Sequence, residues 1–348
     1  MGEVLRGDLT ERERDILLKI AQLYIKEGEP VGSRTLQKTY SLPFSPATIR
    51  NVMADLEDKG YLYQPHTSAG RVPTDKGLKV YINNLFLALG SEDETLVNRL
   101  IDYLRSEGVS DRDEVLSKVL DFICSLTGYV GFGANLIEEL TVDSLTLLKV
   151  ASDKILLVIN FKPDYVIHKV IRATVLDAEL PKLSKALTQK FRGKTLKEIK
   201  RELVSEIDGL RREVSQLSFR LNSQILKSLN EVNHLEIQGT ANFANIVSDV
   251  SRLKELLEIL EEKSLFLEIL KRFLAEEKKI SVILGSETGV ETFSPFSFVL
   301  SRYGSGVKSG GVIGVIGPKR MDYSQVIPVV ENVSKALSII LKAERESF

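Results

Sequence analysis

The chain has 348 residues, 43% of them hydrophobic and 27% charged, so it is long enough for two or three globular domains. Lys plus Arg number 47 against 48 for Asp plus Glu, and this formal charge of -1 argues against a protein that coats nucleic acid through bulk attraction. The single cysteine, Cys124, excludes an intrachain disulfide. It lies in an apolar stretch, so we expect a small buried side chain and no reactive thiol.

No targeting or membrane segment is predicted. The N-terminus lacks the apolar core of a signal peptide, and Arg6 stands where a myristoylation motif needs Ser or Thr. No apolar run approaches the roughly 20 residues that a membrane span needs. We therefore expect a cytoplasmic protein with no membrane partner.

Three helices are predicted in the first 60 residues. The first covers residues 10–28, where apolar residues recur at three- and four-residue spacing. The second covers residues 33–40. Ser33 is expected to cap it, and Arg34 and Thr35 in its first turn are well placed for a phosphate.

The third helix has the clearest signals. Ser45 is expected to cap its first free N–H groups, and Pro46 takes the first helical position, where proline leaves no hydrogen bond unmade. Its buried stripe consists of Ile49, Val52, Met53 and Leu56. The other face carries hydroxyl, guanidinium and amide groups that suit phosphates and base edges of DNA: Ser45, Thr48, Arg50 and Asn51.

A polar hairpin follows, with short strands predicted at residues 61–63 and 70–73. Four polar side chains lie at or near its tip: His66, Thr67, Ser68 and Arg71. Helix, turn, helix and hairpin in this order indicate a winged helix-turn-helix that reads double-stranded DNA. The alternative is that the polar residues of the third helix and the hairpin are solvated surface of a packing module.

The next segment predicts a helix from Pro73 to about residue 89 and a domain boundary at residues 90–91. Two helices are expected at about 92–105 and 111–126, before Gly128 and Gly131 break the pattern.

The period then changes to that of strands. Residues 145–151, 154–161 and 165–173 predict an antiparallel meander, because only short turns separate them. Residues 181–230 are helical in pattern, and their apolar stripe suits a helical hairpin packed on the meander or a helix–helix dimer contact. Gly209 interrupts the stripe, which favours packed shorter helices over one long coiled coil.

The C-terminal third returns to mixed structure, with a short strand at 235–237, helices within 242–275 and a terminal helix at 321–343. Three further strands are predicted at 280–284, 297–303 and 311–316. The meander and its helices therefore look like an insertion that splits another α/β unit.

The residues offer no arrangement for catalysis, a metal or a cofactor, so we expect no enzyme. The three histidines, His66, His168 and His234, are scattered and lack partners at ligand spacing. Neither a G-x-S-x-G elbow nor a partner that would activate Cys124 is visible. The glycine-rich run at 304–317 lacks the spacing of a nucleotide-binding loop, and a hairpin with a close-packed strand explains it better.

Five segments resemble the HrcA family, the heat-inducible transcription repressors of bacteria. They are residues 30–36 (PVGSRTL), 47–51 (ATIRN), 65–71 (PHTSAGR), 73–77 (PTDKG) and 314–323 (GVIGPKRMDY). The likeness covers essentially the whole chain. One departure is Val52, where the family pattern has an acidic residue, and this change extends the buried stripe without altering the base-facing residues.

The resemblance implies an α+β multidomain protein. Residues 1–90 would form the winged helix-turn-helix, 91–140 and 233–348 a discontinuous GAF-like α/β domain, and 141–232 an inserted dimerisation domain with a three-stranded antiparallel sheet and helices. It also implies a homodimer that represses chaperone operons at an inverted-repeat operator and is kept active by the GroEL chaperonin. The alternative is a ligand-gated regulator whose GAF-like domain binds a small molecule, although no motif for a ligand is visible.

Overall fold

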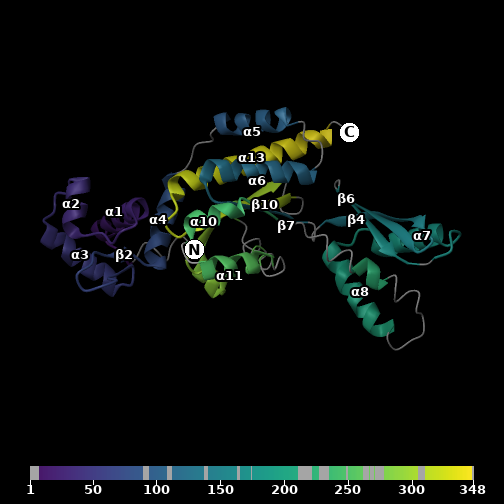
Figure 1. Ribbon diagram of the computed structural model, residues 1–348, viewed down its shortest axis with the longest axis horizontal. Coiled ribbons are helices and arrows are strands. Elements are labelled where there is room, and N and C mark those ends of the chain that lie inside the picture. Colours follow the sequence, from purple (N-terminus) through teal and green to yellow (C-terminus); the bar gives the residue numbers. More distant parts are fainter. Residues whose placement is uncertain are drawn as a thin grey trace.

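The computed structural model describes residues 8–88, 94–107, 112–136, 140–162, 165–173, 175–210, 222–226, 235–247, 250–261, 266, 270, 278–304 and 310–346. These residues form an α+β protein with three sheets, as the sequence predicts at this level. Its three parts follow one another along the longest axis of the molecule (Figure 1). The predicted boundaries at 90–91 and 232–233 lie outside the described residues, as does His234.

The N-terminal unit, residues 8–88, contains helices and a short hairpin in the predicted order. Its elements are α1 (Glu11–Glu27), α2 (Ser33–Tyr40), α3 (Pro46–Asp58), β1 (Leu62–Tyr63), β2 (Val72–Pro73) and α4 (Asp75–Ala88). Thr10 and Glu13 form a capping box at the start of α1. Gly28 ends α1 with φ 77°, in the left-handed region that favours glycine. The apolar stripes of α1 and α3 meet in one core.

The central unit contains a five-stranded antiparallel sheet in the order β7-β3-β10-β9-β8. Its strands are β3 (Val130–Leu136), β7 (Leu235–Gln238), β8 (Ile280–Leu284), β9 (Phe296–Gly304) and β10 (Gly310–Pro318). Its helices are α5 (Glu94–Ser106), α6 (Arg112–Thr127), α10 (Phe243–Ile246), α11 (Val250–Glu261) and α13 (Tyr323–Glu346). Three short 3-10 helices complete it: Thr240–Asn242, Gly285–Thr288 and Glu291–Phe293.

Alternation along the strands gives this sheet two buried faces. On β9, Val299 faces the core under α5, α6 and α13, whereas Phe298 and Leu300 face the core under α10 and α11. The second core is rich in phenylalanine. The ring centroids of Phe132 and Phe266 are 5.1 Å apart, and the rings meet edge to face. Helices on both faces of the sheet give a three-layer arrangement (Figure 1).

The third unit has a separate core and extends from the other end of the central unit (Figure 1). Strands β4 (Thr141–Ala151), β5 (Lys154–Lys162) and β6 (Tyr165–Arg172) form the predicted antiparallel meander. Helices α7 (Leu180–Phe191) and α8 (Leu196–Leu210) cover one of its faces. Gly193, with φ 79°, lies between them and divides this helical stretch, whereas Gly209, where the sequence suggested the interruption, lies within α8. Residues 222–226 are also helical, while the rest of the predicted stripe beyond 210 lies outside the described residues.

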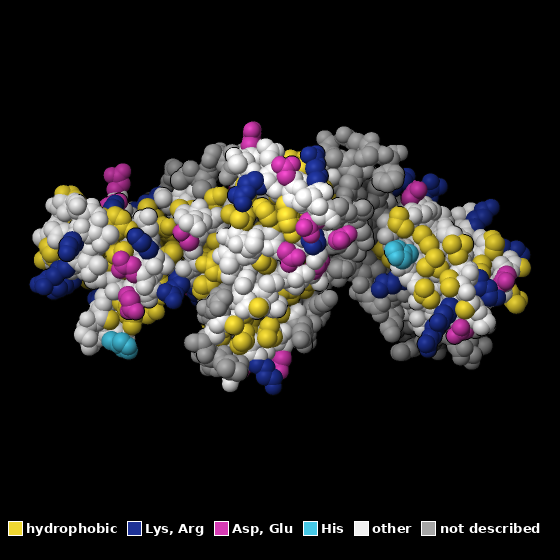
Figure 2. Space-filling view, turned by 45° about the horizontal axis from the view of Figure 1, so that its top comes forward, with side chains coloured by type: hydrophobic (Ala, Val, Ile, Leu, Met, Phe, Trp, Pro, Cys, Tyr) yellow, Lys and Arg dark blue, Asp and Glu magenta, His cyan; other side chains and the backbone are white. Residues whose placement is uncertain are grey.

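The other face of this meander exposes apolar side chains. Four of them are half exposed or more: Leu148, Val150, Val166 and Val170. Figure 2 shows hydrophobic side chains gathered on the lobe that this unit forms, beside a histidine. A sheet that buries one face and exposes apolar side chains on the other is unusual for a monomer, because an exposed apolar surface of this kind normally contacts a partner.

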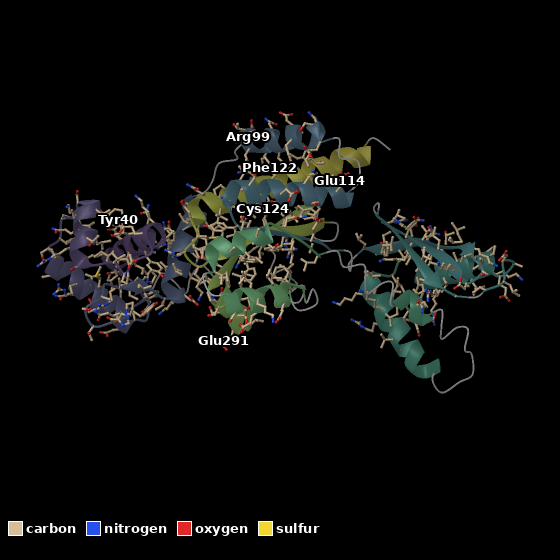
Figure 3. The ribbon with its side chains drawn as sticks, viewed as in Figure 1. Tyr40, Arg99, Glu114, Phe122, Cys124 and Glu291 are labelled. Carbon is tan, nitrogen blue, oxygen red and sulfur yellow. The ribbon has the colours of Figure 1, made fainter. Side chains whose placement is uncertain are left out.

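The sequence missed one central element, strand β3. Gly128 and Gly131 suggest only the end of a helix, yet β3 pairs with both β10 and β7. Its glycines allow α6 to lie very close to the sheet, since a β-carbon at Gly133 would be 2.7 Å from Leu116 Cδ1. Cys124 of α6 is buried over the same strand, and burial raises the pKa of its thiol to about 11 (Figure 3). This agrees with the expected inert, buried cysteine.

Candidate nucleic-acid interface

Helix α3 is built as the sequence predicts. The Ser45 side chain accepts a hydrogen bond from the Thr48 N–H at 3.1 Å, and Pro46 occupies the first helical position. The Ser45 and Thr48 hydroxyl oxygens are 2.9 Å apart. All four residues of the predicted stripe are buried. Arg50 and Asn51 are exposed, on the side of the helix away from that stripe.

The start of α2 differs from the prediction. Ser33 was expected to be the capping residue, but Gly32 is the N-cap and no side chain caps this helix. Ser33 is the first helical residue and is buried. Arg34 and Thr35 remain exposed in the first turn. The first turn of α2 therefore presents backbone N–H groups together with the Arg34 and Thr35 side chains.

The hairpin between β1 and β2 is closed by one side chain. The Gln64 amide nitrogen donates to the carbonyl oxygens of Thr67 and Ala69, both at 2.9 Å. Three predicted residues, His66, Thr67 and Ser68, are exposed at the tip of this loop. Figure 2 shows a histidine at one end of the N-terminal lobe, with Lys and Arg side chains on the same lobe.

The hairpin is also docked on the segment before α2. Val31 and Arg71 exchange two backbone hydrogen bonds of 2.9 Å, which adds a third strand position to the hairpin. Gly70 makes this approach possible, because a β-carbon there would lie 2.4 Å from the Val31 carbonyl carbon. These contacts therefore fix the position of the hairpin relative to the start of α2.

Arg71 has a partner that the sequence did not reveal. Its Nε lies 2.8 Å from Glu57 Oε2, in the last turn of α3, and the Arg71 side chain is only 17% exposed. The other oxygen of Glu57 accepts from the Gln64 N–H at 3.1 Å. The Glu57 carboxylate thus joins α3 to the residue after β1 and to the residue before β2, and Arg71 is held by it rather than extended into solvent.

A second pair braces the same, C-terminal end of α3. Lys59, just after α3, donates to both carboxylate oxygens of Glu13 at 2.9 and 3.0 Å. The hydrogen bond from Lys59, with that from the Thr10 N–H, holds the pKa of Glu13 below its ordinary value. The Thr-x-x-Glu pattern at residues 10–13 is a capping-box signature, so the sequence carried a signal for Glu13.

The predicted site residues therefore fall into three groups. The structure brings exposed side chains together on one unit from α2, α3 and the hairpin tip: Arg34, Thr35, Ser45, Arg50, Asn51, His66, Thr67 and Ser68. Thr48 and Arg71 are half-buried and engaged within the unit, and Ser33 is buried. Glu57, Gln64 and Lys59 are structural residues of the site that sequence reasoning did not identify.

Comparison with known proteins bears on what such a surface serves. The family model described as HrcA protein C terminal domain matches residues 113–327. A heat-inducible transcription repressor HrcA from Syntrophobacter fumaroxidans is 34% identical, with 98% of this chain and 99% of that protein covered. The chain belongs to the HrcA family. HrcA repressors of Clostridium perfringens (strain 13) and Xylella fastidiosa (strain M23) are each 33% identical over 96% of this chain.

A solved structure shares the fold of this chain. A hypothetical protein of known crystal structure is 25% identical, covers 96% of this chain and 99% of its own, and superposes with a TM-score of 0.61. HrcA relatives are described as heat-inducible transcription repressors. Among the described residues, no helix is both long and apolar enough to span a membrane.

Proposed function

We propose that this chain is a heat-inducible transcriptional repressor that binds an inverted-repeat operator before chaperone operons as a homodimer. In this proposal residues 1–90 form a winged helix-turn-helix, with α3 as the recognition helix and the β1–β2 hairpin as the wing. The observation that carries it is the exposure of Arg50 and Asn51 on α3, beside exposed polar groups of α2 and the wing. The repressor activity follows from membership of the HrcA family.

The roles within this interface follow from position. Arg50 and Asn51, near the N-terminal end of α3, suit base edges in the major groove. Arg34 and Thr35 at the uncapped start of α2 suit a backbone phosphate, as does the wing tip at 66–68. Arg71 and Ser33 are better suited to holding the unit together, because one is paired with Glu57 and the other is buried.

The proposed dimer rests on the exposed face of the third unit, residues 141–232. Leu148 pairs with Leu156, and Leu156 with Val170, so the apolar side chains lie side by side across all three strands. Two copies that bury this face would relate two reading units by a twofold axis, which matches an inverted repeat. The near balance of charge in the chain supports the need for two sites, since a single copy gains little from bulk attraction.

The central unit is proposed to be GAF-like and discontinuous, formed by residues 91–140 and 233–348. A small-molecule effector is the less favoured alternative, because the core under α10 and α11 is filled by phenylalanine rings in mutual contact. The ring centroids of Phe293 and Phe298, for example, are 5.3 Å apart. We propose that the GroEL chaperonin, as the family resemblance implies, keeps the repressor competent.

Footprinting of the pure protein on the regions upstream of chaperone genes tests the function. Protection of an inverted repeat is the expected result, and absence of protection with chaperonin-treated protein would contradict the proposal. Addition of chaperonin or of a metabolite extract then separates the two modes of control, because only one of them should increase operator binding.

A further inference from the structure

Two widely separated segments among those resembling the family meet in space. Lys319, from residues 314–323, places its Nζ 2.6 Å and 2.7 Å from the two carboxylate oxygens of Asp75, from residues 73–77. Asp75 begins α4 of the N-terminal unit, whereas Lys319 follows β10 of the central sheet. This ion pair therefore crosses the junction between the proposed DNA reader and the rest of the molecule.

The next turn of α4 makes a second pair of contacts with the central unit. Lys79 donates to the Val282 carbonyl oxygen of β8 at 2.7 Å, and its Nζ is 2.7 Å from Glu287 Oε2. Ser286, in the 3-10 helix after β8, donates to Asp75. Asp75 and Lys79 are four residues apart, so both project from one side of α4. That side of α4 is the one that faces the sheet.

The contact is apolar as well as polar. Ala21 of α1 and Leu78 and Ile82 of α4 belong to the same hydrophobic core as Val282 and Val326 of the central unit. A core that crosses a junction resists sliding, since any rotation of one unit would expose buried apolar surface.

Residues 317–323, which we call the positioning turn, touch the reader at a further point. The Arg320 guanidinium lies over Gly28, the residue that ends α1, and a β-carbon at Gly28 would be 1.8 Å from Arg320 Nη1. A cation at a helix C-terminus is favourable, because it faces the negative end of the helix dipole. Neighbouring residues Lys319 and Arg320 thus hold α4 and α1, two different elements of the same unit.

The positioning turn is itself held rigidly. The Lys319 N–H donates to the Pro295 carbonyl at 3.0 Å, and the Lys319 carbonyl accepts from the Tyr323 hydroxyl at 2.7 Å. Tyr323 is fully buried, and its hydroxyl oxygen lies 2.8 Å from that of Ser297. Burial raises the pKa of Tyr323, so the hydroxyl stays a donor at any physiological pH. Hydrogen bonds therefore hold both the N–H and the carbonyl of Lys319, and they fix the backbone from which its side chain extends to Asp75.

From this geometry we propose that the positioning turn sets the orientation of the DNA reader, with Lys319 and Asp75 as its principal pair. The inference rests on the proposed function as a dimeric reader of an inverted repeat. Two readers held at fixed angles bind both half-sites only when the half-sites are correctly spaced. The positioning turn would therefore make the protein selective for operator spacing, while contributing nothing to the reading of a single half-site.

The test compares Lys319→Ala with the matched control Lys118→Ala. Lys118 forms an ion pair of the same length, 2.7 Å, with Glu107, but both residues lie within the central unit. Operators with spacers of graded length, and an isolated half-site, are titrated with each full-length protein. Lys319→Ala should lose about tenfold in affinity at the preferred spacer and keep half-site affinity within about twofold, because only simultaneous engagement is impaired. Its dependence on spacer length should become flatter.

A charge exchange and a DNA-free measurement complete the test. The double variant Asp75→Lys, Lys319→Asp should recover part of the spacer preference, which a general loss of stability would not allow. Spin labels at exposed Asp58→Cys and Glu258→Cys, in dimers diluted with unlabelled protein, should give one narrow distance distribution that Lys319→Ala broadens. The protein without these two substitutions, treated with the same spin label, is the control for labelling of buried Cys124.

The outcomes separate this inference from the proposed function. Identical spacer profiles and identical distance distributions for Lys319→Ala and Lys118→Ala would overturn the positioning role. If the unmodified protein bound no inverted repeat at all, the proposed function would fail, and the spin-label distances would still decide whether the turn fixes the reader.

Discussion

The Nε atom of Arg71 lies 2.8 Å from Glu57 Oε2, so the β1–β2 hairpin, the proposed wing, is tied to the last turn of α3. The sequence predicts Arg71 as one of the polar side chains near the hairpin tip that contact DNA. Because its guanidinium is mostly enclosed and already has an anionic partner, we interpret it as the residue that sets the wing against α3.

This interpretation predicts that Arg71→Ala and Glu57→Gln weaken operator binding by a similar amount, about 1 kcal/mol, and that the double variant is no worse than either single one. The salt dependence should stay unchanged, because no phosphate contact is lost. Arg34→Ala is the comparison, since loss of a true phosphate contact should lower the slope of log affinity against log salt by about one. Binding titrations at several salt concentrations measure both. A reduced slope for Arg71→Ala alone would restore it as a DNA contact.

The exposed pair on α3 predicts loss of sequence preference. Arg50→Ala or Asn51→Ala should weaken operator binding by about 1–3 kcal/mol and relax the preference for particular bases. The control is Lys26→Ala, an exposed cation in the last turn of α1, whose removal should change operator affinity little. Competition between operator and altered-base DNA provides the measurement. Unchanged affinity in both α3 variants would contradict the recognition-helix assignment.

The sequence predicted the elements around this interface well because their signals are local. Three signals for α3 lie within the helix or directly before it: the capping residue Ser45, Pro46 in the first turn and the periodic apolar stripe. Predictions that depended on partners distant in sequence were poorer. No spacing rule predicts the ion pair between Arg71 and Glu57. Ser33, expected as the cap of α2, is instead its buried first residue, with Gly32 as the N-cap.

The same distinction explains the missed strand. The β3 glycines have no value as a strand signal by themselves, because glycine is depleted in strands. Their role becomes visible only once Leu116 of α6 lies over Gly133. The contact between Asp75 and Lys319 is likewise not predictable from the sequence, although both segments resemble the family.

The apolar face of the third unit predicts which substitutions would disrupt the proposed dimer. Leu148→Asp and Val170→Asp place a charge on β4 and β6, the strands on either side of β5, and should convert the proposed dimer to a monomer that binds the full operator no better than a half-site. Val204→Asp, at an exposed position of α8 on the opposite side of that sheet, is the matched control. Analytical ultracentrifugation gives the mass of each variant. A persistent dimer in Leu148→Asp would place the interface elsewhere.

The Glu13–Lys59 pair predicts acid sensitivity of the N-terminal unit. The pKa of Glu13 is lowered in the folded protein, so its stabilising contribution is complete above the ordinary value of 4.5 and disappears as the pH falls through the lowered pKa. Glu13→Gln should therefore unfold at lower denaturant concentration at pH 7, and the difference from the unmodified protein should shrink below about pH 4. Urea unfolding at the two pH values measures this. A difference that is the same at both would show that packing, and not charge, gives Glu13 its role.

The topology predicts that unassisted folding is inefficient. Strands β3 and β10 are neighbours in the central sheet, yet the third unit lies between them in the chain. Such non-local pairing is slow, and it leaves apolar strands such as β5 exposed in the meantime. Protein refolded alone should thus be mostly aggregated or inactive, whereas the GroEL chaperonin should raise the operator-competent fraction without any small molecule. That fraction is measured by operator titration with and without chaperonin and ATP, and a chaperonin that cannot release its substrate serves as control. Full activity after refolding alone would contradict control by the chaperonin and leave the repressor assignment intact, because DNA reading and folding are tested separately.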